Sequence, residues 1–277
     1  MSCGCGRSPD FCRGWHSLSE EEWKKELAEW KADNEFEKPV EGKHMVEVTE
    51  VHHYTDKLFR FCTEKPKGYL FQAGEFVMIG LGDKIKRAYS VTSSPTQDHL
   101  EFYSIKVPDG KLTSRLKNIQ PGDKIEVGSK STGTLLPKYL KPGRNLWLMA
   151  TGTGIAPFIS LLRSQEIFWM FKNVYVTWTV RVPRELDAYQ EYIKSTPATL
   201  FTTVTQDTKY QGLHGRIQKH IERGVILPDM NPEDDRIMLC GSMAFNEDLK
   251  TILESNGFTE GNTNTPGDYV VEKAFVG

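Results

Sequence analysis

The chain has 277 residues, a formal net charge of −2, 38% hydrophobic and 26% charged residues, and a mean hydropathy of −0.47. This length predicts two domains that each bury a core, and the composition excludes a membrane-spanning or disordered chain. The balanced charge lacks the excess of basic residues that is typical of nucleic-acid-binding proteins. The first residues are polar and lack the apolar stretch of a signal peptide, so we expect a cytoplasmic protein with neither nucleic-acid nor membrane partners.

Three of the 5 cysteines lie within the first dozen residues. Cys3, Cys5, Cys12 and His16 offer three thiolates and one imidazole, which is a ligand set for zinc or a [2Fe–2S] cluster. A segment this short and polar cannot bury a hydrophobic core, so it needs a bound metal in order to fold. Three interpretations stay open at this point: an iron–sulfur centre, a zinc site, or a tail that binds nothing.

A helix is predicted directly after this segment. Ser19 and Glu22 have the spacing of a capping box, which marks a helix start. Three apolar side chains at helical spacing share one face of this helix: Trp23, Leu27 and Trp30. The stripe predicts that the helix docks onto the rest of the protein, with a partner-binding helix as the alternative. We assign residues 1–33 to an N-terminal Cys/His extension with this one helix, and residues 34–43 to a linker.

Short β-rich runs follow between residues 44 and 142. They are Met45–Val51, Leu58–Thr63, Phe76–Leu81, Arg87–Thr92, Leu100–Val107 and Lys124–Val127. Turn clusters such as Pro121-Gly122 separate them. Six short strands over about a hundred residues predict a small antiparallel β-barrel.

From residue 143 to residue 277 the pattern alternates between strands and helices. The expected strands are Leu146–Ala150, Val174–Val180, Leu200–Val204 and Arg236–Cys240. The expected helices are Ile159–Phe171, Glu185–Ile193, Ile217–Glu222 and Ala244–Ser255. This alternation predicts an α/β domain with a doubly wound parallel sheet, which binds ligands at the carboxyl ends of its strands.

A glycine turn joins the first of these strands to its helix. Gly152 and Gly154 allow the backbone to approach a ligand closely, and the helix N-terminus that follows favours a phosphate. The third glycine of the usual dinucleotide fingerprint is absent, and no Gly-Lys-Ser/Thr follows. Taken alone, the segment fits either a nucleotide-binding turn or a tight turn without a ligand.

A second candidate segment, Arg87-Ala88-Tyr89-Ser90, ends a predicted barrel strand. Arg87 offers a bidentate fork for a pyrophosphate, and Tyr89 lies on the same side of the strand, where its ring can cover a planar cofactor. The Ser90 hydroxyl can hydrogen-bond a ring nitrogen. Taken alone, these four residues also fit an ordinary strand end.

Four spaced motifs together resemble the ferredoxin–NADP reductase family over about residues 44–277. They are Arg87–Ser90, Lys111–Thr113, Gly152–Gly154 and Leu239–Ser242. The closing residues Val270–Gly277 resemble the bacterial branch of that family. The resemblance implies an FAD-binding barrel over residues 44–142 and an NADP-binding domain over residues 143–277.

The resemblance also implies an activity, that of an FAD-dependent ferredoxin (or flavodoxin)–NADP(+) reductase. Such an enzyme exchanges a hydride between NADPH and flavin N5 and exchanges single electrons with a carrier protein. Two alternatives stay open. One is the reductase component of an oxygenase system, and the other is a flavoprotein platform for an N-terminal metal-binding or interaction module.

Flavin-binding residues follow from the same resemblance. Arg87 would grip the FAD pyrophosphate, Tyr89 would stack on the isoalloxazine, and Ser90 would lie near flavin N5. The rest of the FAD cradle would comprise Ala88, Tyr103, Lys111, Leu112, Thr113, Thr153, Ala274 and Phe275.

The resemblance places NADP(H) at the carboxyl end of the parallel sheet. The residues expected there are Gly152, Gly154, Val180, Arg181, Thr205, Gln206, Arg216 and Cys240. The family commonly binds the 2′-phosphate with two arginines, and in this chain Gln206 stands at the first position and Arg216 at the second. Because one charge-assisted contact is missing, we predict NADP(H) binding with weakened discrimination against NAD(H). Lys209 and Tyr210 are the alternatives that could supply the missing contact.

Three residues are expected at the reacting atoms: Ser90, Cys240 and Glu272. The resemblance implies that Cys240 and Glu272 line the nicotinamide pocket, Cys240 by packing rather than as a nucleophile. Without it, a cysteine after an apolar strand would be an ordinary small buried residue, and a lone glutamate near a terminus would be solvated. Hydride transfer between stacked rings needs no general base of the catalytic-triad type.

The N-terminal segment carries a resemblance of its own. Residues 3–16 resemble CDGSH-type iron–sulfur proteins, which pair a Cys-x-Cys with a later Phe-Cys-x-Gly-x-His. This chain departs from that pattern at Arg13 and Trp15, and by a shorter gap between Cys5 and Cys12. Zinc therefore remains a rival to the [2Fe–2S] cluster.

Overall fold

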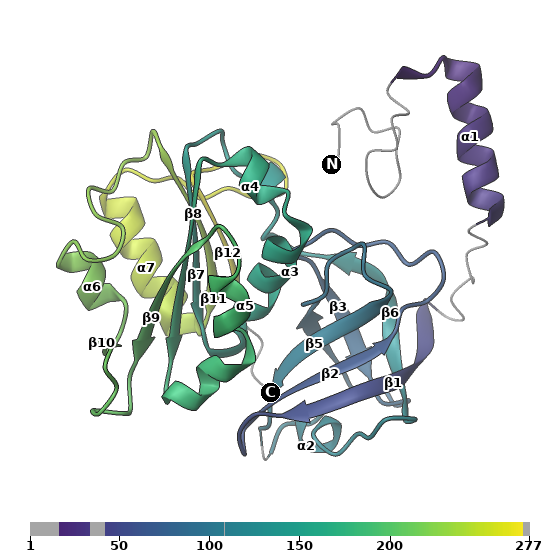
Figure 1. Cartoon of the computed structure of the whole chain (residues 1–277), viewed down its shortest axis with the longest axis horizontal. Coiled ribbons are helices and arrows are strands. Elements are labelled where there is room, and N and C mark those ends of the chain that lie inside the picture. Colours follow the sequence, from purple (N-terminus) through teal and green to yellow (C-terminus); the bar gives the residue numbers. More distant parts are fainter. Residues whose placement is uncertain (1–16, 34–41, 108, 274–277) are drawn as a thin grey trace.

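The computed structural model of the protein describes residues 17–33, 42–107 and 109–273 (Figure 1). These residues form an N-terminal helix, an antiparallel barrel and a parallel sheet flanked by helices. The predicted fold class is confirmed for the two larger parts. Six residues of the predicted sites lie outside the described residues: Cys3, Cys5, Cys12, His16, Ala274 and Phe275.

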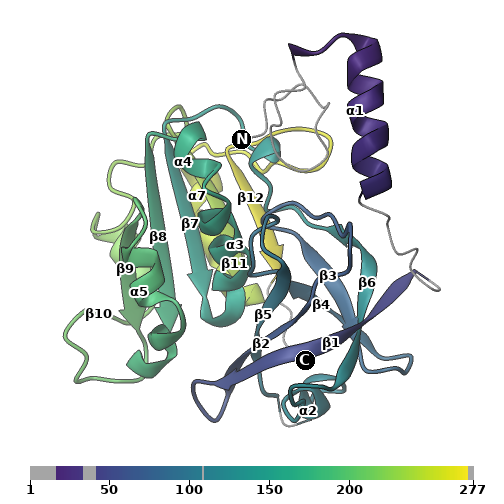
Figure 2. The ribbon, with the colours of Figure 1, turned by 45° about the vertical axis from the view of Figure 1, so that its right-hand side comes forward.

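Helix α1 (Glu20–Asp33) begins at the predicted capping box. The backbone N–H of Ser19 donates to the Glu22 carboxylate at 2.9 Å, and the backbone N–H of Glu22 donates to the Ser19 hydroxyl at 3.3 Å. Figures 1 and 2 show the helix outside both sheets. Of its apolar stripe, only the partly buried Trp23 side chain is described, so docking of this face stays a prediction.

The barrel contains six antiparallel strands in the order β4-β3-β6-β1-β2-β5. They are β1 (Lys43–His53), β2 (Leu58–Glu64), β3 (Phe76–Gly80), β4 (Lys86–Ser90), β5 (His99–Ile105) and β6 (Lys124–Thr132). A bridge between Val91 and Phe102 closes the barrel beside the end of β4. The short helix α2 (Thr113–Leu116) adds Leu116 to the barrel core, and the preceding residue Leu112 packs there too. All six predicted strands are present, and β6 extends beyond the expected end at Val127.

The second sheet is parallel throughout, in the order β10-β9-β8-β7-β11-β12. Its strands are β7 (Asn145–Thr151), β8 (Asn173–Val180), β9 (Thr199–Val204), β10 (Leu213–His214), β11 (Asp235–Gly241) and β12 (Tyr269–Lys273). The chain winds outward from β7 to β10 and then returns to β11 on the other side of β7. This reversal creates a topological switch point between β7 and β11, where such sheets bind ligands.

Helices cover both faces of the parallel sheet. One face packs against α3 (Ala156–Ser164), α4 (Ile167–Met170), the 3₁₀ helix η4 (Pro183–Ala188) and α5 (Gln190–Lys194). The other face packs against α6 (Gln218–Glu222) and α7 (Met243–Ser255). Two 3₁₀ turns complete the described elements, η2 (Pro137–Tyr139) and η3 (Gly152–Ile155). None of the described helices has the length and apolarity to span a bilayer.

Two of the predicted helices are wrong in extent. The helix expected over Ile159–Phe171 divides into α3 and α4, because Gln165 adopts a left-handed φ of 62° that ends α3. The helix expected over Glu185–Ile193 divides into η4 and α5 at Tyr189, whose φ and ψ of −142° and −3° are not helical.

A buried carboxylate holds the two domains together. Glu101 of β5 has 2% of its surface exposed, and each of its oxygens accepts from an arginine. Arg60 of the barrel donates at 3.0 Å and Arg163 of α3 donates at 2.8 Å, while the Tyr189 hydroxyl donates at 3.0 Å. Close by, the Ser160 hydroxyl of α3 donates to the Ser93 carbonyl at 2.6 Å. These bonds fix α3 against the barrel.

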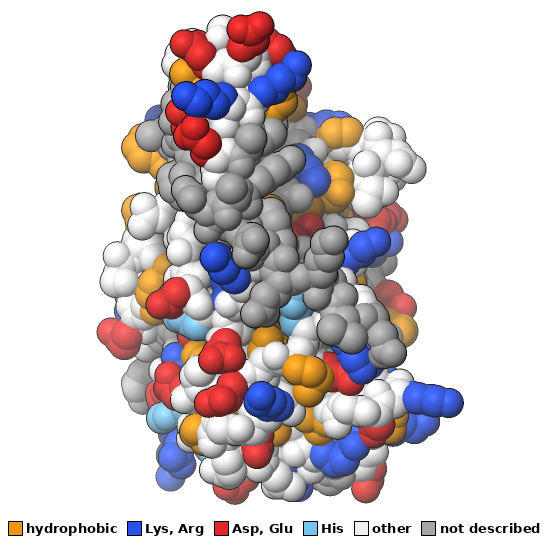
Figure 3. All heavy atoms as spheres, turned by 90° about the vertical axis from the view of Figure 1, so that its right-hand side faces the viewer, with side chains coloured by type: hydrophobic (Ala, Val, Ile, Leu, Met, Phe, Trp, Pro, Cys, Tyr) orange, Lys and Arg blue, Asp and Glu red, His pale blue; other side chains and the backbone are white. Residues whose placement is uncertain are grey.

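The face shown in Figure 3 carries acidic and basic side chains side by side over its described part. Hydrophobic side chains occur there as small separate groups rather than as one broad patch. This distribution is that of an ordinary solvated surface.

Candidate cofactor sites

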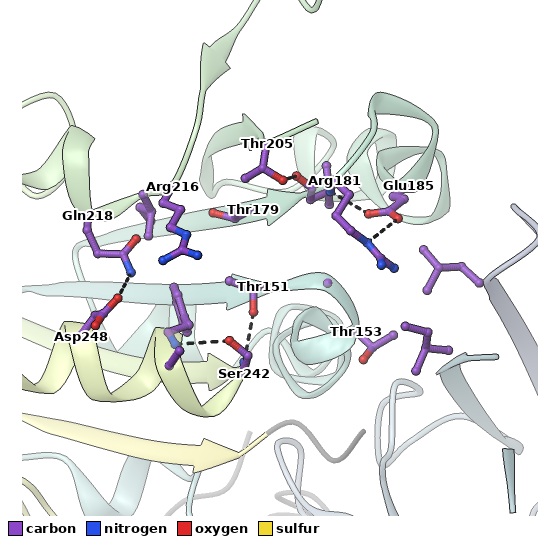
Figure 4. Close-up of a pocket in the computed structure, with 17 residues that line it drawn as sticks. Thr151, Thr153, Thr179, Arg181, Glu185, Thr205, Arg216, Gln218, Ser242 and Asp248 are labelled. Atoms are coloured by element: carbon purple, nitrogen blue, oxygen red, sulfur yellow. Dashed lines mark hydrogen bonds and ion pairs between the residues drawn. The ribbon is translucent and has the colours of Figure 1, made fainter. Parts of the chain in front are cut away.

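A cleft of about 470 Å³ opens at the carboxyl ends of the parallel strands (Figure 4). The ends of β7, β8, β9 and β11 contribute to its wall, which includes Thr151, Gly152, Thr153, Thr179, Val180, Arg181, Thr205 and Ser242. Because it lies at the switch point of the sheet, this cleft has the position of a dinucleotide site. The predicted residues Gly152, Val180, Arg181, Thr205 and Arg216 all line it.

The glycine turn after β7 serves this cleft through Gly152. Gly152 has a φ of 52°, and a Cβ there would meet no atom within 4 Å, so the space over the turn is open to a ligand. Gly154 has a different role. A Cβ on Gly154 would lie 2.1 Å from the carbonyl oxygen of Cys240, so this glycine allows the turn to pack on β11.

Two arginines reach the dinucleotide cleft from opposite ends (Figure 4). Arg181 follows β8, and Arg216 precedes α6. Asp248 of α7 also lines the cleft, but its carboxylate accepts from the Gln218 amide at 2.9 Å. Among the described residues, Arg216 forms no ion pair. Its charge is therefore available to an anionic ligand.

Gln206 does not line the cleft. Its backbone N–H donates to the Arg181 carbonyl at 2.8 Å, which places it beside the wall. The neighbouring Asp207 carboxylate accepts from the Lys209 backbone N–H at 2.8 Å and so turns into its own loop. Position 206 itself therefore carries no cation.

A second, narrower cleft lies between the barrel and the parallel sheet. Its wall includes Ala88, Tyr89, Ser90, Tyr103, Ser104, Ile105, Thr113, Thr153, Gly154, Ala156 and Cys240. The sequence missed Ser104, Ile105 and Ala156, which carry no motif and come from the end of β5 and the start of α3. Thr153 lines both clefts, so the two meet at the glycine turn.

The side chains on the barrel side of the second cleft have the chemistry to hold a flavin, although the cleft itself measures only about 40 Å³. The Tyr89 ring packs edge-on against Phe102 in the core, and the Ser104 hydroxyl contacts the Tyr89 hydroxyl at 3.5 Å. The half-buried Arg87 guanidinium donates only to the Lys86 carbonyl, at 2.8 Å, and has no carboxylate partner in the described part of the chain. Arg87 lines neither cleft, but it directly precedes Ala88 of the narrower one. An unpaired cation next to a cleft walled by two tyrosines suits a pyrophosphate linked to a planar ring.

Only one residue of the predicted Lys111–Thr113 loop faces the second cleft. The Thr113 hydroxyl donates to the Val107 carbonyl at 3.3 Å, and a Cβ on Gly110 would lie 2.0 Å from that hydroxyl. The Leu112 side chain is 1% exposed in the barrel core, and the Lys111 side chain is exposed to solvent. Any contact of Leu112 with FAD would therefore come from its backbone, and any contact of Lys111 from its backbone or its exposed side chain.

Cys240 and Glu272 lie opposite one another on β11 and β12. Burial, helped by the nearby Glu272, raises the pKa of the Cys240 thiol well above its usual range, so it stays protonated at neutral pH. Burial also raises the pKa of Glu272 to about 7, although its carboxylate accepts from the Thr134 backbone N–H at 3.2 Å. Glu272 lines neither cleft, whereas Ser90 and Cys240 line the narrower one.

One group of potential metal ligands lies outside the clefts. Side-chain atoms of Cys62, His99 and Glu101 fall within 4.8 Å of one another. The Glu101 carboxylate is already neutralised by two guanidinium groups, and burial raises the pKa of the Cys62 thiol to about 12. The trio therefore belongs to the contact between the domains.

Comparisons with known proteins match both of the larger parts of the chain. An oxidoreductase FAD-binding domain matches residues 43–134, and an oxidoreductase NAD-binding domain matches residues 148–251. Ferredoxin–NADP reductase A of Sorangium cellulosum is 43% identical over 251 residues, covering 83% of this chain and 89% of that protein. The flavodoxin/ferredoxin–NADP reductase of Rhodobacter capsulatus is also 43% identical over 251 residues, covering 83% of this chain and 92% of its own.

Solved structures extend the agreement to three dimensions. A ferredoxin NADP+ reductase from Neisseria gonorrhoeae with bound FAD and NADP matches with a TM-score of 0.79 and 29% identity, covering 84% of this chain and 99% of that chain. The ferredoxin reductase in carbazole 1,9a-dioxygenase shares the fold at a TM-score of 0.69 and 24% identity, covering 84% of this chain and 69% of that chain. With two cofactor clefts that meet at one turn, the chain belongs to the ferredoxin–NADP reductase family of FAD- and NADP-binding oxidoreductases.

Proposed function

We propose that the protein exchanges hydride with NADP(H) at a bound FAD and exchanges single electrons with ferredoxin or flavodoxin. The observation that carries the proposal is the position of Thr153, which lines both clefts. When bound, FAD supplies chemistry that couples a two-electron hydride donor to a one-electron carrier. A shared wall brings the two cofactor rings together, and orientation accounts for much of the catalysis in such stacks.

The residues of the narrower cleft bind and orient the flavin in this proposal. The rings of Tyr89 and Tyr103 flank the planar system, and Arg87, just outside the cleft, holds the pyrophosphate. The Ser90 hydroxyl offers a hydrogen bond at the cleft wall. The protonated Cys240 thiol packs against the nicotinamide side and excludes water, because its raised pKa keeps it uncharged.

The test uses the purified full-length protein. We expect yellow protein with bound FAD, loss of the flavin absorbance with NADPH under anaerobic conditions, and reduction of added ferredoxin or flavodoxin. Cys240→Ser should slow hydride transfer, whereas the matched variant Cys62→Ser, at a buried thiol outside both clefts, should not. An intact protein that binds no FAD would contradict the proposal. Reduction of an oxygenase in place of both carriers would favour the oxygenase-component alternative.

The cofactor preference is proposed to be NADP(H) with weakened discrimination against NAD(H). Arg216 supports a 2′-phosphate contact, and the missing cation at Gln206 supports the weakening. A comparison of kcat/KM for NADPH and NADH tests this preference. A clear preference for NADH would contradict it.

The N-terminal cysteines support a further proposal, namely a metal site held by Cys3, Cys5, Cys12 and His16. Its support is the presence of four soft ligands at compact spacing in the sequence. Metal analysis should find two irons with absorbance beyond the flavin bands, or one zinc, per chain. The variant Cys3→Ser/Cys5→Ser should lose that metal and keep FAD. Metal-free full-length protein, purified anaerobically, would contradict the proposal.

We also propose that the protein is cytoplasmic. The free thiols of Cys62 and Cys240 support this location, because reducing compartments keep thiols unpaired.

A further inference from the structure

A buried carboxylate lies in the wall of the dinucleotide cleft. Glu185, in η4, is 5% exposed and lines the cleft that the proposed function assigns to a polyanionic ligand. A buried negative charge next to bound phosphates would oppose binding unless a cation neutralises it. The cation beside it is Arg181, four residues earlier in the chain.

Glu185 contacts Arg181 at two points. One carboxylate oxygen accepts from the Arg181 backbone N–H at 2.9 Å, and the other lies 3.5 Å from Nε of the guanidinium. Both contacts are made to the backbone N–H and to Nε of Arg181, and neither uses the two terminal nitrogens of the guanidinium. Figure 4 shows the guanidinium between Glu185 and Thr153, with its terminal nitrogens directed away from the carboxylate.

The terminal nitrogens of Arg181 are therefore left for a ligand. The Arg181 side chain is 39% exposed, and within the described residues its ion pair is with Glu185. Two terminal nitrogens of a planar guanidinium form a fork that matches two phosphate oxygens. Holding an arginine by its backbone and Nε fixes the direction of that fork before a ligand arrives, which lowers the entropic cost of binding.

The segment that carries Glu185 is itself held against the barrel. The Tyr103 hydroxyl lies 3.5 Å from the Glu185 carbonyl oxygen, and the Tyr103 ring packs edge-on against Tyr189 with centroids 5.2 Å apart. These contacts hold the backbone of Glu185 in place, and the Glu185 carboxylate in turn holds the Arg181 side chain in one orientation.

We propose that Glu185 is a positioning residue for nucleotide binding, which orients the Arg181 guanidinium toward the pyrophosphate of NADP(H). This proposal rests on the proposed binding of NADP(H) in the larger cleft. Glu185 acts only through Arg181 and does not touch the nucleotide. Arg216 lies at the opposite end of the cleft (Figure 4), where the proposed function has the 2′-phosphate, so that contact should not depend on Glu185.

The test is a double-mutant cycle in the FAD-loaded full-length protein. Dissociation constants for NADP+ and for adenosine 2′-monophosphate, which has no pyrophosphate, are measured for wild type, Glu185→Ala, Arg181→Ala and the double variant. We expect Glu185→Ala to weaken NADP+ binding about tenfold, the effect of losing one charge-assisted contact. Binding of adenosine 2′-monophosphate should change less than about twofold, and the double variant should match Arg181→Ala, since Glu185 acts through that residue.

Several outcomes would overturn the proposal. Glu185→Ala could bind NADP+ as wild type does, or could lose both ligands equally, which is the signature of a merely structural role. A further loss in the double variant would show that Glu185 acts independently of Arg181. If Glu185→Ala does not fold, Glu185→Gln gives the same comparison, because it keeps an acceptor for the backbone N–H and loses the charge. Wild-type protein that fails to bind NADP+ would refute the proposed function itself, and this inference with it.

Discussion

Position 206 is the residue on which cofactor preference is expected to depend. Gln206 follows β9 beside the cleft wall, where the family commonly has an arginine. We predict that Gln206→Arg raises the ratio of kcat/KM for NADPH to that for NADH about tenfold, because a charge-assisted hydrogen bond is worth about 1.5–3 kcal/mol. Gln211→Arg, on the same exposed loop, should leave the ratio unchanged. An unchanged ratio for Gln206→Arg would place the 2′-phosphate elsewhere.

The protonation of Glu272 should couple stability to pH. Burial raises its pKa from 4.5 to about 7, so the folded state holds this proton more tightly than the unfolded state does. The free energy of unfolding should therefore fall as pH rises from about 4.5 to about 7, by about 3 kcal/mol from this group alone. Chemical denaturation at several pH values measures the effect.

The matched variants for this pH prediction are Glu272→Gln and Glu222→Gln. The first replaces the buried acid by a neutral group and should remove this part of the pH dependence. The second changes an exposed acid at the end of α6 and should retain it. A Glu272→Gln variant whose stability follows pH as steeply as wild type would refute the assignment.

Among the elements, strands and turns were predictable because their signals are local. The six barrel strands and four of the parallel strands stand at their expected places, since each shows an apolar run between turn residues. The strands β10 and β12 escaped prediction. The first is only two residues long, and the second is defined by its pairing with β11, which is distant in sequence.

The candidate site was predictable only in part, because some of its contacts also join residues that are distant in sequence. Residues within motifs, such as Tyr89 and Thr153, line the expected clefts. Glu185 and Glu101 carry no motif, because their partners are set by the fold, and Glu101 meets an arginine 62 residues away. Leu112 lies within a motif, yet its side chain is part of the barrel core.

The break between α3 and α4 offers a test at the level of elements. Gln165 ends α3 with a φ of 62°, a conformation that glycine adopts without a steric penalty. We predict that Gln165→Gly stabilises the protein by up to about 1 kcal/mol, whereas Ser164→Gly, inside the last helical turn, destabilises it by about 0.5–1 kcal/mol. Thermal and urea unfolding measure both effects. Destabilisation by Gln165→Gly would contradict the account of the helix end.

For the whole molecule, the contact at Glu101 should determine how firmly the domains hold together. Glu101→Gln leaves Arg60 and Arg163 without their buried counter-charge, which should destabilise the protein by about 3–5 kcal/mol. Glu50→Gln removes the exposed partner of the same Arg60 and should cost about 1 kcal/mol or less. Urea unfolding measures the stability, and limited proteolysis reports opening between the domains. Equal effects of the two variants would contradict a role for burial.

The position of α3 has a consequence for the exchange of domains between relatives. The first turn of α3 contributes Ala156 to the narrower cleft, and Arg163, about 10 Å further along the helix axis, reaches Glu101 in the barrel. A chimera that joins this barrel to a foreign nucleotide domain would bury Glu101 with only one of its two guanidinium partners, unless the foreign helix also brings an arginine. We therefore expect the two domains to be inherited and recombined as one unit. In a chimera that folds, the junction between the parent sequences should lie outside the stretch from Glu101 to Arg163.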